Sequence, residues 1–275
     1  MILMKVTIAD PCGFCSGVRR AINLGLRSAP AQTLGPVVHN NTVIRSLAAR
    51  GVKPVDDIQS ITAKTIVTRA HGTPKDQMDF LYEEHEVIDA TCPGVYALHE
   101  AAQRFEEEGY HVLVYGDEKH PEITALMSYL SDARVTNEIP KDMPSYVACV
   151  SQTTMNPDDF RSFVEGVRES RPNVVYEDTI CRATQERQEA AAELASKVDM
   201  MVVVGGYHSS NTRKLAALCE RYCHTLHVED ACEVNAESLG DAEHIGLTAG
   251  ASTPDESIEK VYKELENVTS TLSTS

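Results

Sequence analysis

The most constraining feature of this 275-residue chain is a module that occurs three times, each time built around one cysteine. Cys15, Cys92 and Cys181 each follow a short apolar run with strand character and precede a stretch with helical spacing. Such self-similarity fixes the architecture before any local feature does. One thiolate from each repeat, brought to a common axis, would form a three-point metal site with one open coordination position.

The repeat extends beyond the cysteines. Each is followed by a predicted helix and a strand that ends in a histidine loop, where His39, His120 and His208 lie 24, 28 and 27 residues further on. Another helix and strand then lead to a small polar loop, at residues 70–73, 151–154 and 249–252. The third copy lacks its last strand, and the strand at Lys5 to Ala9 can fill that place. The repetition predicts a closed, pseudo-threefold arrangement.

Helices and strands alternate along the whole chain, which predicts the α/β class. Strands are expected at residues 34–38, 65–69, 86–90, 111–115, 146–150, 173–177, 201–205, 225–229 and 244–249. Helices are expected at 95–108 and 254–266 and after the capping residue Asn156, whereas the Ser/Thr-rich tail 269–275 should lack fixed structure. We expect three lobes, at 13–92, 93–180 and 181–275, the third completed by the N-terminal strand within 1–12.

The amino-acid composition limits which binding partners and which cellular compartment we expect for this protein. The net charge of −16 argues against a nucleic-acid surface, which needs a basic stripe. No run approaches 18 apolar residues, and the first 30 residues lack the pattern of a signal peptide, so we expect neither a membrane span nor export. In the cytoplasm the eight cysteines are expected to be thiols or metal ligands and not disulfides.

The three repeat cysteines differ from the other five because symmetry selects them. Three thiolates around an axis suit an iron–sulfur cluster in which one iron has no protein ligand, and that iron could bind a substrate oxygen. The alternative is three core thiols at equivalent places. The cysteines outside the repeat are interpreted as buried or incidental thiols, and these are Cys149, Cys219, Cys223 and Cys232. A ligand or redox role stays open for Cys12.

Polar side chains at the ends of predicted strands form a second group of candidates. Ligand sites in α/β folds lie at the carboxyl ends of strands, where imidazoles, hydroxyls and amides can bind phosphate oxygens. The candidates are His39, His71, His120, Ser209, Ser210, Asn211 and Ser252. Glu122, two residues after His120, is a candidate proton donor or, alternatively, an ordinary first-turn helix acid.

Nine motifs, in order from Pro11 to about Asp255, resemble the LytB/IspH family of 4-hydroxy-3-methylbut-2-enyl diphosphate reductases. They are Gly13-Phe14-Cys15-Ser16-Gly17-Val18, Val37-Val38-His39-Asn40, Ala70-His71-Gly72, Asp89-Ala90-Thr91-Cys92-Pro93, His120-Pro121-Glu122, Gln152-Thr153-Thr154, Ile180-Cys181-Arg182-Ala183-Thr184, Ser209-Ser210-Asn211 and Thr248-Ala249-Gly250-Ala251-Ser252. The resemblance implies a trefoil of three α/β lobes around a 4Fe–4S cluster.

The resemblance also implies roles for individual residues. Cys15, Cys92 and Cys181 match the cluster ligands, and Glu122 matches the proton donor. The positions that match the family's substrate-binding residues are His39, His71, His120, Thr153, Ser209, Ser210, Asn211 and Ser252. The implied oxidoreductase removes the allylic hydroxyl of its diphosphate substrate as water, forming isopentenyl and dimethylallyl diphosphate, with electrons from ferredoxin or flavodoxin. This is the terminal step of the non-mevalonate isoprenoid route.

The sequence differs from the family pattern at one position, and two alternative functions are still open. Cys12 stands where family members more often carry a residue such as Arg. A divalent-metal phosphohydrolase could use the same loops, although it would need more carboxylates than Glu122. A non-enzymatic iron–sulfur sensor is the second rival, and it would want a basic DNA-reading surface that the composition does not supply.

Overall fold

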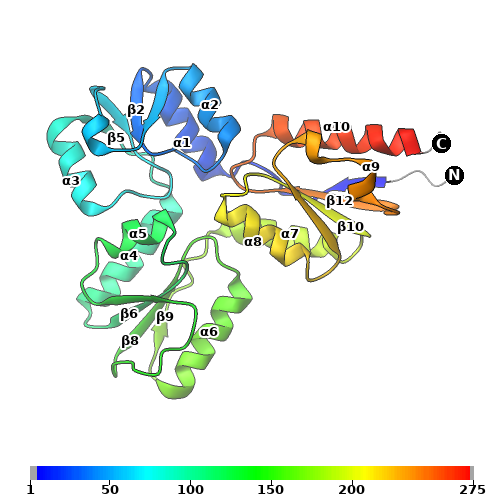
Figure 1. Cartoon of the computed structure of the whole chain (residues 1–275). Coiled ribbons are helices and arrows are strands. Elements are labelled where there is room, and N and C mark those ends of the chain that lie inside the picture. Colours follow the sequence, from blue (N-terminus) through cyan, green and yellow to red (C-terminus); the bar gives the residue numbers. More distant parts are fainter. Residues whose placement is uncertain (1–4, 273–275) are drawn as a thin grey trace. The chain divides into compact units, whose positions relative to one another are not determined.

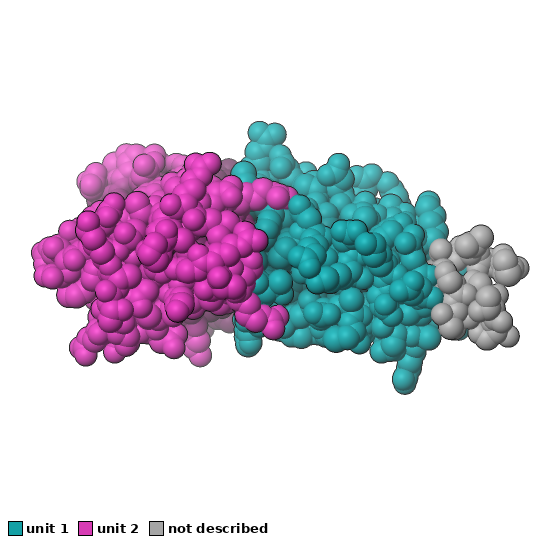
Figure 2. Space-filling model, turned by 90° about the horizontal axis from the view of Figure 1, so that it is seen from above, with its two compact units in different colours: residues 1–16, 39–43, 182–275 teal, residues 17–38, 44–181 magenta. Residues whose placement is uncertain are grey.

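Residues 5–272 are described by the structure, a computed structural model in which helices and strands alternate along most of the chain (Figure 1). Its strands form three separate four-stranded sheets, and all their pairings are parallel. This confirms the predicted α/β class with three lobes. The chain divides into two compact units, coloured differently in Figure 2: unit 1 comprises the N-terminal segment to Ser16, His39–Val43 and the chain from Arg182, and unit 2 comprises Gly17–Val38 and Ile44–Cys181.

The first sheet, in unit 2, has the order β3-β2-β4-β5. Its strands are β2 (Ala31–Leu34), β3 (Val52–Val55), β4 (Thr65–Val67) and β5 (Glu86–Ile88). The helices of this part of the chain are α1 (Ser16–Arg27), α2 (Asn41–Ala49) and α3 (Lys75–Glu84), and a 3-10 turn, η1 (Ile58–Ser60), precedes β4. The central strand β4 buries Ile66 and Val67 completely, as expected for a parallel strand covered on both faces.

The second sheet, also in unit 2, has the order β7-β6-β8-β9. Its strands are β6 (His111–Tyr115), β7 (Ala133–Thr136), β8 (Val147–Ser151) and β9 (Val175–Tyr176), and its helices are α4 (Pro93–Glu107), α5 (Pro121–Met127) and α6 (Pro157–Ser170). The Asn156 side chain accepts hydrogen bonds from the N–H groups of Asp158 and Asp159, at 2.9 and 3.1 Å. The predicted capping of α6 is therefore confirmed.

The third sheet lies in unit 1 and has the order β1-β12-β10-β11. Its strands are β1 (Lys5–Ile8), β10 (Met200–Val204), β11 (His224–Val228) and β12 (His244–Ala249). The helices are α7 (Arg182–Ala195), α8 (Ser210–Cys219), α9 (Ala236–Leu239) and α10 (Asp255–Leu272), and η2 (Ala231–Glu233) is a 3-10 turn. β1 pairs with β12 in parallel register from Lys5 opposite His244, at the edge position that the third repeat itself does not supply.

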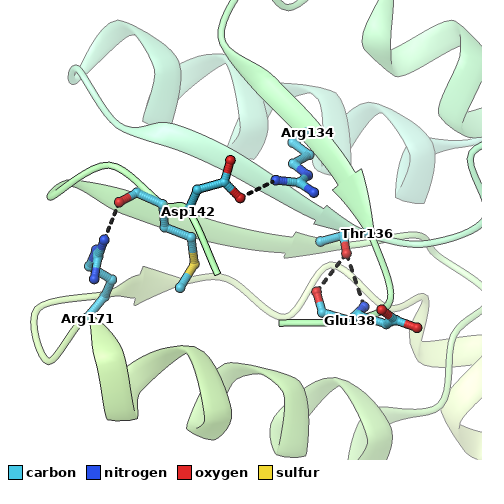
Figure 3. A network of polar contacts seen from close by, with 6 residues as sticks. Arg134, Thr136, Glu138, Asp142 and Arg171 are labelled. Atoms are coloured by element: carbon cyan, nitrogen blue, oxygen red, sulfur yellow. Dashed lines mark hydrogen bonds and ion pairs between the residues drawn. The ribbon is translucent and has the colours of Figure 1, made fainter. Parts of the chain in front are cut away.

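The connection between β7 and β8 contains no helix or strand and is held by side chains instead (Figure 3). Thr136 donates to the carbonyl of Glu138 and accepts from its N–H, at 2.6 and 3.0 Å. Arg134 pairs with Asp142 at 3.4 Å. The Arg171 guanidinium donates to the carbonyls of Met143 and, at 2.6 Å, Pro144. These contacts give hydrogen-bond partners to the carbonyls of Glu138, Met143 and Pro144 in a segment without regular structure.

Two sequence predictions about elements are wrong. The strand expected at 34–38 ends at Leu34, because Gly35 adopts a φ of +74° and turns the chain. Val37 and Val38 are buried in the loop that follows, so their apolar character reflects burial and not strand structure. The tail expected to lack structure continues α10 to Leu272, and residues 273–275 lie outside the described part of the chain.

Candidate active site

The three repeat cysteines occupy the same place in the fold, at the start of a helix that follows a strand. Cys92 is the N-cap of α4, and Cys15 and Cys181 directly precede α1 and α7. The positive end of a helix dipole favours negative charge at this place, which suits a thiolate.

The main chain holds the three cysteines in the same way. The N–H of Cys15 donates to the carbonyl of Ala251 at 3.1 Å, that of Cys92 to Ala70 at 2.9 Å, and that of Cys181 to Thr153 at 2.9 Å. Each acceptor lies in the small polar loop of the preceding repeat, and for Cys15 this is the loop of the third repeat. The sequence repeat is therefore reproduced in individual hydrogen bonds.

Two of the three sulfur atoms are close together within unit 2. An added Cβ on Gly94 would lie 3.8 Å from the Sγ of Cys181 and 4.0 Å from the Sγ of Cys92. Because Gly94 has no side chain, a space the size of a methyl group is left beside both sulfurs. Cys15 belongs to unit 1. Among the described residues no three His, Cys, Asp or Glu side chains converge on one ion, but the ligands of a polynuclear cluster bind different irons and lie further apart.

Cys12, in contrast, belongs to the core of unit 1. Its side chain packs against a buried apolar cluster that includes Ile245, Leu247 and Ile258. Burial raises the pKa of its thiol to about 11, although the positive charge of Arg187 acts in the opposite direction. Cys12 is therefore a protonated, partly buried thiol and not a ready metal ligand.

The cysteines outside the repeat fall into two groups. Cys149 and Cys219 are completely buried, and burial raises the pKa of each thiol to about 12. Burial also raises the pKa of Cys223, which packs beside Cys219, whereas Cys232 is exposed. These positions agree with the interpretation of buried or incidental thiols.

Unit 2 contains a buried carboxyl group among the candidate site residues. Glu122, in the first turn of α5, is 3% exposed, and Thr153 binds both its oxygens. The Thr153 N–H donates to Oε1 at 2.8 Å, and the hydroxyl lies 2.7 Å from Oε2. The carbonyl of the same threonine accepts the N–H of Cys181. One residue thus joins the candidate acid to a candidate cluster ligand.

Two histidines accompany Glu122 in unit 2. His120 is the N-cap of α5, and its Nδ1 accepts the N–H of Glu122 at 3.2 Å. Nε2 is therefore the protonated nitrogen of the neutral ring. The rings of His71 and His120 lie edge to face with centroids 6.5 Å apart. We call this set the acid half-site, defined as His71, Cys92, His120, Glu122, Thr153 and Cys181.

The remaining candidates gather in unit 1. Ser209 caps α8, where its Oγ accepts the N–H of Thr212 at 3.3 Å, and both Ser209 and Ser210 are buried. Ser252 donates to the carbonyl of His39 at 3.4 Å. The same carbonyl would lie 3.2 Å from an added Cβ on Gly206, just before α8. Three loops therefore meet, and we call this set the hydroxyl half-site, defined as Cys15, His39, Ser209, Ser210, Asn211 and Ser252.

The hydroxyl half-site contains an unsatisfied donor. The Nδ2 of Asn211 is buried, and no hydrogen-bond acceptor lies within reach among the described residues. A buried donor without a hydrogen bond costs about 1–3 kcal/mol of folding free energy, so an acceptor atom of a ligand would be stabilising here. With the first turn of α8, this group suits the oxygens of an anion. His208, at the repeat-equivalent position, is exposed.

Sequence analysis did not identify two arginines that hold the cysteine segments. Arg187 is 5% exposed and donates to the carbonyl of Gly13, and Arg20 donates to the carbonyl of Thr91. Their partners are main-chain atoms far away in the sequence, so no residue pattern reveals them. The open space beside Gly94 was also missed.

The donor set fits the cofactor and ligand expected from the sequence. Two cysteine sulfurs lie beside the Cα of Gly94, the third cysteine has the same kind of main-chain anchor, and the unpaired Asn211 amide suits an anionic ligand. The fold is that of a three-lobed α/β protein with its candidate site at the carboxyl ends of parallel strands. The chain belongs to the LytB protein family, whose sequence profile matches residues 6–266.

Individual relatives agree with this family. The chain is 40% identical to the 4-hydroxy-3-methylbut-2-enyl diphosphate reductase of Thermoanaerobacter sp. (strain X514), over 95% of this chain and 96% of the relative. It is 34% identical to the protein of the same name from Clostridioides difficile (strain 630), over 96% of this chain and 100% of the relative.

Solved structures give the same result. The E-1-hydroxy-2-methyl-but-2-enyl-4-diphosphate reductase of Plasmodium falciparum matches with a TM-score of 0.90 and 26% identity, over 94% of this chain and 87% of that one. A structure described as (E)-4-hydroxy-3-methyl-but-2-enyl diphosphate reductase, the terminal enzyme of the non-mevalonate pathway, matches with a TM-score of 0.70 and 34% identity, over 96% and 100%. Between residues 5 and 272, no helix is long and apolar enough to cross a membrane.

Proposed function

We propose that this chain is a 4-hydroxy-3-methylbut-2-enyl diphosphate reductase, the terminal oxidoreductase of the non-mevalonate isoprenoid route. It removes the allylic hydroxyl of its substrate and forms isopentenyl and dimethylallyl diphosphate. The observation that carries this proposal is the triple role of Thr153, which binds both oxygens of Glu122 and accepts the N–H of Cys181. A buried acid is thereby fixed next to a redox-cofactor ligand, and family membership supports the same reaction.

Cys15, Cys92 and Cys181 hold a 4Fe–4S cluster in this proposal, with one iron left without a protein ligand. When bound, the cluster supplies electrons one at a time and a Lewis-acidic iron. The anchoring of all three cysteine N–H groups to equivalent carbonyls supports their common role. The lobes are proposed to be residues 13–92, 93–180 and 181–275, with 1–12 completing the third.

The diphosphate is bound by neutral donors in this proposal. The hydroxyl half-site contributes His39, Ser209, Ser210, Asn211 and Ser252, and the acid half-site contributes His71 and His120. The orphaned Nδ2 of Asn211 and the Nε2–H tautomer of His120 support this assignment. Local donors can hold an anion on a protein of net charge −16, because fields beyond about 8 Å are largely screened at physiological salt.

Glu122 and Thr153 supply a proton. The reaction consumes two electrons and two protons: the allylic C–O bond breaks, the oxygen leaves as water, and the carbon skeleton gains one hydrogen. A protonated Glu122 can donate to the Thr153 hydroxyl, which can in turn donate to the leaving oxygen, since a hydroxyl both accepts and donates. The 2.7 Å separation of Oε2 and the hydroxyl supports this relay.

The electrons come from ferredoxin or flavodoxin in this proposal, and the reaction takes place in the cytoplasm. The test is anaerobic reconstitution with iron and sulfide, followed by turnover of the allylic diphosphate with dithionite-reduced viologen. We expect a brown protein, both isoprenoid diphosphates, and two viologen radicals oxidised per substrate. Release of inorganic phosphate without viologen oxidation, by a colourless protein, would instead support a metal-dependent phosphohydrolase.

A further inference from the structure

A buried arginine holds the segment that leads to Cys15. Arg187, on α7, donates through Nε and Nη2 to the carbonyl of Gly13, at 3.0 and 2.8 Å. Its Nη1 donates back to the carbonyl of Ala183 at 2.7 Å. Gly13 has a φ of +74°, and an added Cβ would lie 2.6 Å from the Cδ1 of Ile258. The peptide two residues before the cysteine is therefore fixed from both sides.

Arg20 makes the corresponding contact in unit 2. From α1 it donates through Nη1 to the carbonyl of Thr91 at 3.1 Å, and through Nη2 to that of Asp89 at 3.3 Å. Thr91 directly precedes Cys92. In both cases the arginine stands on the helix that follows one repeat cysteine and binds carbonyls just before another. Unlike Arg187, Arg20 is an exposed residue, so its contacts compete with water.

The segment before Cys181 is held differently. The hydroxyl of Thr179 donates to the carbonyl of Ser151 at 2.6 Å and accepts the N–H of Ser151 at 2.8 Å. The Asp178 carboxylate accepts the N–H of Ile180 at 3.0 Å. These groups are neutral or negative, so the guanidinium contacts at the other two cysteines add positive charge as well as order.

The hydrogen-bond acceptors of Arg187 are carbonyl oxygens, which do not neutralise its charge. The nearby acidic side chain is that of Asp255, whose Oδ1 would lie 3.5 Å from an added Cβ on Gly13. A buried cation is costly unless an anion offsets it. An iron–sulfur cluster with thiolate ligands becomes more negative on reduction, and hydrogen bonds and net charge set its potential. A cation held two residues from a ligand would favour the reduced form.

We propose that Arg187 and Arg20 are positioning residues, which orient Cys15 and Cys92 for the cluster, and that Arg187 in addition favours cluster reduction by its charge. This inference rests on the proposed function. Contacts that orient metal ligands commonly change metal affinity by about 10–100-fold when removed. Arg187 should lie at the upper end of that range and Arg20 at the lower.

The test compares Arg187→Met, Arg187→Lys and Arg20→Met with Arg161→Met as the control. Arg161 lies on α6, outside the segments next to the repeat cysteines, and its side chain is 70% exposed and pairs with Asp158. Three quantities are measured on each protein: the rate of iron release to a chelator, the midpoint potential of the cluster, and the thermal unfolding of the cluster-free chain.

We expect Arg187→Met to release iron about 10–100-fold faster and to have a lower midpoint potential than the control. Arg187→Lys should keep the potential of the wild type but still release iron faster, because lysine retains the charge without the two-pronged contact. Arg20→Met, which alters an exposed side chain and should fold, is expected to release iron faster by a smaller factor.

Iron release and potential equal to those of the control, with only the unfolding temperature lowered, would show that Arg187 merely stabilises the fold and would overturn the inference. Equal release by Arg20→Met and the control would overturn the role of Arg20. A wild-type chain that takes up no cluster would contradict the proposed function itself, and this role with it.

Discussion

The two half-sites differ in what they contain, although each includes a repeat cysteine. The acid half-site in unit 2 holds a buried carboxyl group, two histidines and two cysteines whose sulfurs border the same open space. The hydroxyl half-site in unit 1 holds hydroxyls, an orphaned amide and a single cysteine. The three repeats thus differ in the side chains they contribute to the candidate site, whereas the main-chain hydrogen bond at each cysteine is of the same kind.

The difference suggests a division of work. In the proposed reaction, proton delivery would depend on unit 2, since Glu122 is the carboxylate among the candidates. Anion binding would depend largely on unit 1, where the donors are neutral and the Asn211 amide has no acceptor among the described residues. Cluster binding should depend on both. Each prediction below separates these contributions.

The largest effect is expected from the cysteines. Cys15→Ser should lower bound iron and reduce turnover to background, as should Cys92→Ser, because serine is a poor ligand for iron–sulfur clusters. Iron and sulfide analysis with the viologen assay measures both quantities. Cys232→Ser, which changes an exposed thiol outside the repeat, is the control and should behave as the wild type. Full iron content in Cys15→Ser would place the cluster in unit 2 alone.

The next largest effect is expected at Glu122. Glu122→Gln keeps the shape of the side chain but cannot deliver a proton, so kcat should fall by about 10²–10⁴-fold. The substrate affinity, measured by calorimetry, should stay within a few-fold of the wild type. Glu118→Gln alters an exposed carboxylate of the same loop and serves as the control. A kcat equal to that of the control would contradict the proposal that Glu122 delivers the proton.

A moderate effect is expected in the hydroxyl half-site. Asn211→Ala should raise KM by about tenfold or more, because a hydrogen bond to a charged group contributes about 1.5–3 kcal/mol. The kcat should change little. The cluster-free variant should unfold at the same temperature as the wild type or higher, since the alanine removes an unsatisfied buried donor. His208→Ala, at an exposed neighbour, is the control, and an unchanged KM in Asn211→Ala would contradict the proposed diphosphate contact.

The smallest effect is expected at Cys12. Because burial raises the pKa of this thiol from 9.0 to about 11, the unfolded chain loses its proton first as the pH rises. The stabilising contribution is complete below pH 9.0 and is lost as the pH approaches about 11. Cys12→Ala should therefore weaken the decline of unfolding free energy across this interval, measured in urea, without changing iron content. A loss of iron would show that Cys12 is a ligand.

Sequence analysis predicted the parts of the fold that repeat and missed those that depend on long-range contacts. The repeat spacing indicated the α/β class, and the capping sequence at Asn156 indicated the start of α6. β3 and β7 were missed because they are short edge strands, and β3 contains Pro54, which usually argues against a strand.

The candidate site shows the same division. Residue types and spacing selected the cysteines, the histidine loops and Glu122. They did not select Arg187, whose contact with Gly13 spans 174 positions in the sequence. Nor did they indicate that Thr153 joins Glu122 to Cys181, because that link uses the main-chain atoms of the threonine. Contacts made through main-chain groups leave little trace in residue identity.

The central claim is that Cys15, Cys92 and Cys181 together bind a single iron–sulfur cluster. The most direct measurement is the anomalous diffraction of iron in crystals of the anaerobically reconstituted protein. We expect one iron–sulfur cluster bound by the Sγ atoms of Cys15, Cys92 and Cys181, with one iron that has no protein ligand. Iron bound at other residues, or a cluster that lacks Cys15, would contradict it.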